Sequence, residues 1–162
     1  MKGIPSVIDR LNKLLTGELT AADQYFIHSR MYQNWGFHKL YERLEHERVE
    51  ELEHAAKLIQ RILFLEGVPD VASRAPLAIG SDVPSMIKND LAYELSVVAD
   101  LKEAIGHCEQ VQDYDTRRLL GELLDDTEND HTRWLEQQLF LINAMGLANY
   151  AQSAAGDISS ST

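Results

Sequence analysis

Two short motifs in the sequence place a histidine three residues after a glutamate. They are Glu51-Leu52-Glu53-His54 and Glu128-Asn129-Asp130-His131, and none of the other four histidines has a glutamate at this spacing. Residues three apart lie on one face of a helix, so each motif can direct a carboxylate and an imidazole at the same metal ion. The spacing therefore indicates metal chemistry, provided that both motifs lie on helices.

Two further glutamates stand where helical spacing calls for an apolar residue. Glu18 is four residues after Leu14, and Glu94 is three residues after Leu91. An unpaired buried carboxylate is costly, so glutamates that meet in one core require cations to neutralise them. The sequence thus predicts a layer of six ligands for two divalent ions, made up of Glu18, Glu51, His54, Glu94, Glu128 and His131.

Apolar residues recur at helical spacing along almost the whole chain, which predicts an all-α fold. Four long helices are expected over about residues 5–34, 37–66, 83–110 and 115–145, with a short fifth helix over 147–155. Each of the four core-facing glutamates lies within about three residues of the middle of its helix. Side chains at mid-height meet whichever way each helix runs, so the six ligands are expected to converge.

The lengths of the connections predict the topology. Tight turns near Gly36 and near Asp113-Tyr114 make two antiparallel helix pairs. Between the pairs lie residues 67–82, which reach roughly 50 Å when extended, enough to pass a helix about 42 Å long. A crossover of this kind makes the middle two helices of a four-helix bundle parallel. We expect one domain over residues 1–155 and a disordered tail over 156–162.

Composition excludes several classes of protein. The chain has 15 Lys and Arg against 26 Asp and Glu, a net charge of −11 that disfavours nucleic acid and anionic membranes as partners. Its single cysteine, Cys108, permits no intrachain disulfide and no cysteine-based zinc or iron–sulfur site. The sequence has no apolar run long enough to span a membrane and no signal-peptide pattern, so a cytoplasmic location is expected.

From Met1 to about Gln152 the chain resembles a bacterioferritin, a member of the ferritin-like di-iron family. The stretches at residues 23–30 (DQYFIHSR) and 61–67 (RILFLEG) resemble the family pattern, together with both Glu-x-x-His motifs. The resemblance implies a ferritin-like bundle that stores iron in a hollow shell of 24 subunits. It also implies a ferroxidase centre with two iron ions per subunit, where Fe(II) is oxidised by dioxygen or hydrogen peroxide.

The resemblance also implies roles for single residues. Glu18 and His54 would hold one iron, Glu94 and His131 the other, and Glu51 and Glu128 would bridge them. Tyr25 and Trp134 match aromatic residues near the family's centre. His46 with Glu50 resembles an iron site on the inner surface, although aspartate is usual at the second position. The short fifth helix would line the fourfold axes of the shell.

One position departs from the family pattern. A methionine from each of two subunits binds haem in bacterioferritins, and this chain has Leu52 at that position. A leucine side chain cannot ligate iron, so we expect a homo-oligomer without bis-methionine haem. Assembly with a haem-binding bacterioferritin subunit would restore haem at sites that the partner contributes.

Other interpretations remain open at this point. The six charged residues could form buried salt bridges or face solvent, Tyr25 could be a plain core tyrosine, and His46 could lie on a solvated face. The alternative functions are a DNA-protecting mini-ferritin, a non-storage di-iron peroxidase and a metal-free helical adaptor. The negative net charge disfavours a DNA-protecting protein, and the absence of a four-cysteine iron domain disfavours a rubrerythrin-type peroxidase. A metal-free adaptor would leave the core carboxylates unexplained.

Overall fold

A computed structural model describes residues 1–156, so the predicted tail falls, apart from Gly156, outside the described residues. Within these residues every regular element is a helix, which confirms the predicted fold class. The fourth predicted helix consists of three segments that follow one another without a loop, the middle one a π-helix. The elements are α1 (Pro5–Trp35), α2 (His38–Phe64), α3 (Val83–Gln110), α4 (Tyr114–Asp126), η1 (Thr127–Thr132), α5 (Arg133–Met145) and α6 (Leu147–Ala155).

Local sequence signals set the helix ends. Pro5 occupies the first turn of α1, where its missing N–H is not needed. Gly36 ends α1 in the left-handed conformation, with φ of 84°, which glycine adopts without strain. At the start of α3, Asp82 accepts a hydrogen bond from the Ser85 backbone N–H, and the Ser85 hydroxyl accepts one from the Asp82 N–H, forming a capping box.

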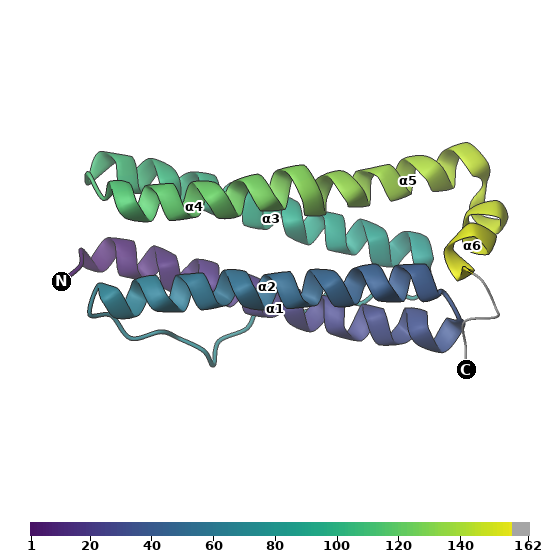
Figure 1. The fold of residues 1–162 in the computed structure, drawn as a ribbon, viewed down its shortest axis with the longest axis horizontal. Coiled ribbons are helices and arrows are strands. Elements are labelled where there is room, and N and C mark those ends of the chain that lie inside the picture. Colours follow the sequence, from purple (N-terminus) through teal and green to yellow (C-terminus); the bar gives the residue numbers. More distant parts are fainter. Residues whose placement is uncertain (157–162) are drawn as a thin grey trace.

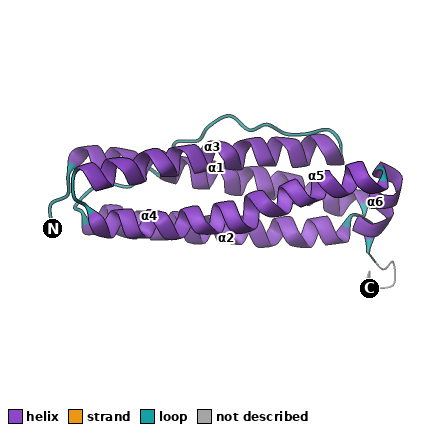
Figure 2. Ribbon diagram, turned by 90° about the horizontal axis from the view of Figure 1, so that it is seen from above, coloured by secondary structure: helices purple, strands orange, loops and turns teal. Residues whose placement is uncertain are grey.

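The helices form a bundle with the predicted connectivity. Figure 1 shows α1 beside α2 and α3 beside α4 and α5, each pair antiparallel, with α6 across one end. The segment between α2 and α3 runs along the outside of the bundle, as Figure 2 shows from above. It returns the chain to the opposite end, so α2 and α3 run in the same direction. The long crossover is therefore confirmed.

Side chains of α1 hold the crossover segment in place. Its backbone N–H groups at Asp70, Ala75, Ala78 and Gly80 donate to successive α1 side chains, namely Asn12, Thr20, Gln24 and His28, over 2.8–3.1 Å. Gln24 and His28 also contact the buried carboxylate of Asp90 on α3, each at 2.8 Å. Hydrogen bonds through α1 side chains thus connect the crossover segment to the buried core.

The apolar core is divided into two parts. One part includes Leu11 on α1, Leu58 on α2 and Leu101 on α3, and the other includes Tyr32 and Met86. Between the two parts lies a layer of buried polar side chains at mid-height, and every long helix contributes to it. Packing alone would fill this layer with apolar residues, so its polarity points to a function.

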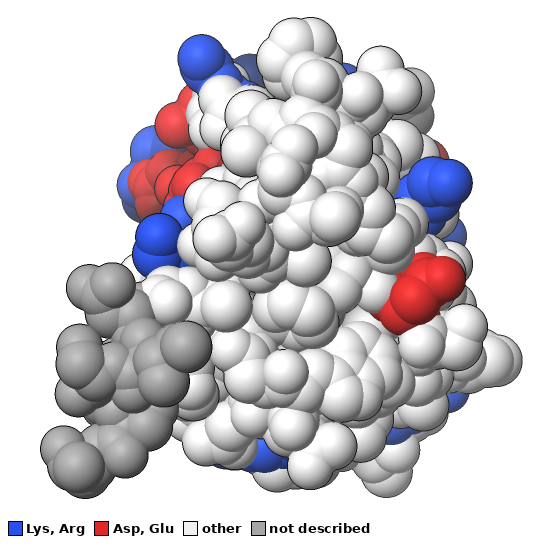
Figure 3. All heavy atoms as spheres, turned by 90° about the vertical axis from the view of Figure 1, so that its right-hand side faces the viewer, with Lys and Arg blue, Asp and Glu red and all other residues white. Residues whose placement is uncertain are grey.

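The surface is uneven in charge. Viewed from the end that carries α6, the molecule is mostly uncharged, with acidic and basic groups at the edges (Figure 3). Large apolar side chains are exposed near this end, among them Trp35, Met145 and Leu147. Among the described residues, none of the helices is apolar over a length that would cross a membrane.

Candidate metal centre

Five of the six predicted ligands meet in the polar layer. Each is at most 3% exposed, and the four long helical segments of the bundle all contribute. Their ligand atoms fall into two groups, each within 4.8 Å, and both groups contain the Glu51 carboxylate. The groups are Glu18, Glu51 and His54, and Glu51, Glu94 and His131. The structure therefore places two three-residue sites side by side with one shared carboxylate.

The two imidazoles are arranged alike around Glu51. The Nδ1 atom of His54 lies 3.6 Å from Glu51 Oε2, and the Nδ1 atom of His131 lies 2.9 Å from Glu51 Oε1. Glu18 Oε2 is 3.6 Å from His54 Nδ1, and Glu94 Oε1 is 3.5 Å from His131 Nδ1. The rings are stacked, with centroids 5.7 Å apart. Each half of the site thus offers two carboxylates and one imidazole nitrogen.

Burial and charge perturb the titration of these groups. Desolvation, followed by the neighbouring Glu51 carboxylate, raises the pKa of Glu18 to about 8. Burial disfavours the charged form of His54, but the Glu18 and Glu51 carboxylates outweigh it and raise its pKa to about 10. The pKa of His131 is also raised, against the effect of burial, by Glu47, Glu51 and Glu94. The site therefore holds protons tightly until a cation replaces them.

The residues present fit a pair of metal ions. Glu18 Oε1, Glu51 Oε1, His54 Nδ1 and His131 Nδ1 are buried and make no hydrogen bond of good geometry. Buried polar atoms are nearly always hydrogen-bonded, so orphaned atoms that face one another call for a ligand. Carboxylate oxygens and imidazole nitrogens are a donor set suited to divalent transition metals, iron included.

Glu128 lies outside both groups in the structure, so its role as a bridging ligand stays a prediction. Its side chain is 40% exposed and forms an ion pair with Lys102 on α3. The cause is η1, because a π-helix takes more residues per turn than an α-helix, so residues three apart no longer share a face. His131 still faces the core, whereas Thr127 is the buried residue of the preceding turn and donates to the Leu123 carbonyl.

The other predicted residues lie at different distances from the centre. Tyr25 is buried and donates its hydroxyl hydrogen to Glu94 Oε1, so it touches the site directly. Burial, followed by the Glu94 charge, raises the pKa of Tyr25 well above its usual value.

The half-buried Trp134 ring lies under the Arg43 guanidinium at 5.2 Å. His46 and Glu50 form an i,i+4 ion pair of 3.2 Å, and Leu52 is 43% exposed.

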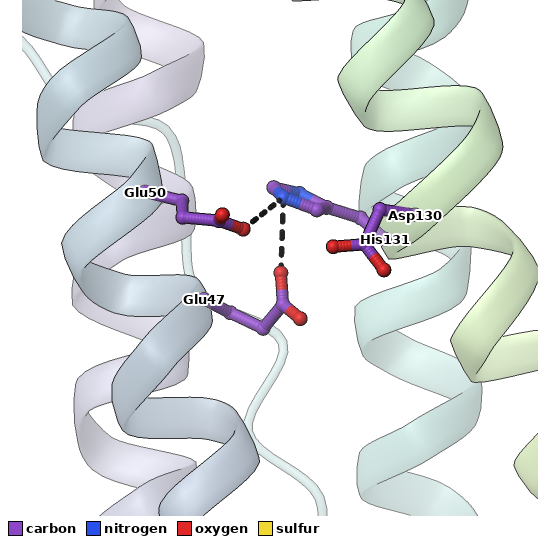
Figure 4. A group of neighbouring side chains, drawn as sticks. All are labelled: Glu47, Glu50, Asp130 and His131. Atoms are coloured by element: carbon purple, nitrogen blue, oxygen red, sulfur yellow. Dashed lines mark hydrogen bonds and ion pairs between the residues drawn. The ribbon is translucent and has the colours of Figure 1, made fainter.

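A second cluster beside the centre was missed from the sequence. Figure 4 shows Glu47 and Glu50 from α2 approaching one nitrogen of the His131 ring, with Asp130 nearby. Glu47 is three residues after Leu44 and four before Glu51, which is core-facing spacing. That signal was available, but Glu47 lies in a run of charged residues typical of a solvated face. The spacing of Asp130 in the sequence gave no such signal, because the π-helical geometry of η1 determines where its side chain points.

Comparisons with known proteins agree with this arrangement. A family model described as a ferritin-like domain matches residues 8–145. A protein named bacterial ferritin from Paramagnetospirillum magnetotacticum is 65% identical over 98% of this chain and 97% of the relative. Another of that name from Synechocystis sp. is 58% identical, covering 94% of this chain and 98% of the relative. A bacterioferritin from Brucella melitensis is 41% identical over 94% of each chain. The resemblance to bacterioferritins is thereby confirmed, and the chain belongs to the ferritin family.

Proposed function

We propose that this protein stores iron and oxidises Fe(II) at the paired sites around Glu51. The observation that carries the proposal is the shared carboxylate, because it joins two otherwise separate carboxylate and imidazole groups into one centre for two ions. Two sites that share a ligand hold their ions close together. Such a pair can pass two electrons to one oxidant molecule.

The reaction we propose balances with the groups present. Two Fe(II) ions enter as substrate and lose one electron each, dioxygen gains both electrons with two protons, and two Fe(III) ions and one hydrogen peroxide leave. With hydrogen peroxide as oxidant, two further Fe(II) ions and two protons give two waters. Three carboxylates and two neutral imidazoles leave one positive charge on a ferrous pair, and they leave coordination positions free for the oxidant.

Ion binding at the centre is coupled to the release of protons. Glu18 and both imidazoles bind protons strongly while the site is free of metal, and they release these protons when ions bind. Tyr25 fixes the orientation of Glu94 through its hydroxyl. We assign Tyr25 to the centre on this contact.

Storage requires an enclosed space, and we propose a hollow shell of 24 copies in the cytoplasm. Relatives named bacterial ferritin and bacterioferritin match nearly the full chain, and the uncharged end that carries α6 suits contact between copies. A subunit of net charge −11 associates many times only if its charge faces pores and a cavity filled with cations. We further propose that His46 and Glu50 take iron on the inner surface, and that the shell lacks haem unless a haem-binding subunit joins it.

Rapid mixing of the metal-free protein with Fe(II) in air tests the proposed reaction. Glu18→Ala, Glu94→Ala and His131→Ala should each abolish the fast phase of Fe(II) oxidation while leaving the helical content unchanged. Glu53→Ala is the matched control, since it removes an exposed glutamate of α2 that belongs to neither group. Equal initial rates in all four variants and the parent would sink the assignment of the site.

A further inference from the structure

The His131 ring is flanked by carboxylates at both nitrogens. Nδ1 faces Glu51 and Glu94 in the centre. Nε2 forms a hydrogen bond with Glu50 Oε2 at 3.1 Å and lies 3.0 Å from the buried Glu47 Oε2, an ion-pair contact without hydrogen-bond geometry. A neutral imidazole has one N–H and one lone pair. When Nδ1 uses its lone pair on a metal ion, Nε2 carries the hydrogen, with Glu50 to accept it and the Glu47 carboxylate beside it (Figure 4).

The other imidazole of the centre follows the same rule. His54 presents Nδ1 to Glu18 and Glu51, and its Nε2 lies 3.4 Å from Asp126 Oδ2. Each histidine therefore has inner carboxylates at Nδ1 and an outer carboxylate at Nε2. Asp126 is 52% exposed, however, whereas the Glu47 side chain is only 2% exposed. The outer partner of His131 is thus far better shielded from water.

Glu47 is itself held in place by ion pairs. Its Oε1 atom pairs with Arg43 Nε, and the same guanidinium pairs with Asp130 Oδ1 at 2.7 Å. The Arg43 guanidinium lies over the Trp134 ring, which restricts it further. A fixed cation therefore already neutralises the cluster outside His131. This argues that Glu47 serves the imidazole and is not a ligand of a third metal ion.

We propose that Glu47, fixed by Arg43, is a positioning residue: its buried carboxylate beside Nε2 keeps the hydrogen of His131 on that nitrogen, where Glu50 accepts it, and so keeps Nδ1 directed at the second metal ion. This inference rests on the proposed function, because it assumes that His131 is a ligand. An outer carboxylate orients the ring and makes the ligating nitrogen more basic. Loss of such a partner typically weakens metal binding by about 10–100-fold.

Anaerobic titration of the full-length, metal-free protein with Co(II) tests the proposal without relying on catalysis. The parent should bind two Co(II) ions tightly per chain in the centre. Glu47→Leu should weaken one of the two by about 10–100-fold and change the visible spectrum of that ion only. Glu47→Gln keeps a polar oxygen beside Nε2, so its affinity for that ion should lie between those of the parent and Glu47→Leu. Glu53→Gln, an exposed change on the same helix, is the matched control and should match the parent.

Three outcomes decide between the possibilities. If the parent binds two ions and both Glu47 variants bind them as the parent does, the positioning role is wrong while the centre stands. If a third tight ion binds and is lost in Glu47→Gln, Glu47 is a ligand and the inference is overturned. If the parent binds no ion in the centre, the proposed function itself fails. Should Glu47→Leu not fold, Glu47→Gln against Glu53→Gln gives the same comparison.

Discussion

One substitution should change stability and metal binding in opposite directions. Glu18→Gln keeps the size and shape of a buried side chain but removes its ability to ionise. In the metal-free protein the pKa of Glu18 is about 8, because it is buried beside Glu51, whereas an ordinary glutamate has a pKa of 4.5. The folded protein therefore binds this proton more tightly than the unfolded chain does.

The sign and size of the effect follow from that difference. A carboxyl group whose pKa is raised by folding destabilises the folded protein as pH rises from 4.5 towards 8. Between pH 4.5 and pH 7 the span is about 2.5 pH units, and about 1.4 kcal/mol per unit gives a loss of about 3 kcal/mol. Glutamine does not ionise, so the variant should escape this loss. It should also lose a ligand that metal binding requires.

Urea unfolding of the metal-free proteins measures the effect at several pH values. Near pH 4.5 parent and variant should unfold with similar free energies, and by pH 7 the variant should be more stable by about 3 kcal/mol. Added Co(II) should stabilise the parent more than the variant, which keeps only the site of Glu51, Glu94 and His131 intact. A constant difference between the two proteins across this pH range would refute the burial argument for Glu18.

Three further predictions concern the rest of the molecule. Asp90→Ala should lower the free energy of unfolding by about 2–5 kcal/mol, because it leaves Gln24 and His28 without their buried partner; an unchanged urea midpoint would contradict this. Expressed with ample haem, the parent should show little haem absorbance and Leu52→Met should gain a six-coordinate spectrum; strong haem absorbance in both would show another mode of binding. Light scattering at physiological salt should show a large particle, and a monomer or dimer at all protein concentrations would count against the proposed storage shell.

Much of the fold could be predicted from the sequence because its signals are local. Helical spacing of apolar residues, Pro5 and Gly36 at the helix ends and the length of the crossover all act within a few turns of chain. The polar layer was predictable for the same reason, since Glu18 and Glu94 visibly interrupt apolar stripes. These features need no knowledge of which side chains meet.

What the sequence could not predict is the π-helical segment. Thr127, Asn129 and Asp130 favour helices weakly, but this does not reveal where an extra residue widens a turn. That widening rotates Glu128 out to Lys102 and brings Asp130 beside Arg43. A spacing rule for an α-helix cannot foresee this change.

The central claim is that two metal ions share Glu51. Anomalous X-ray scattering from crystals soaked anaerobically with Fe(II) measures this directly. We predict two peaks per chain in the mid-height layer, one at Glu18 and His54 and one at Glu94 and His131, both in contact with Glu51. Absence of peaks from this layer, or peaks that make no contact with Glu51, would contradict the account.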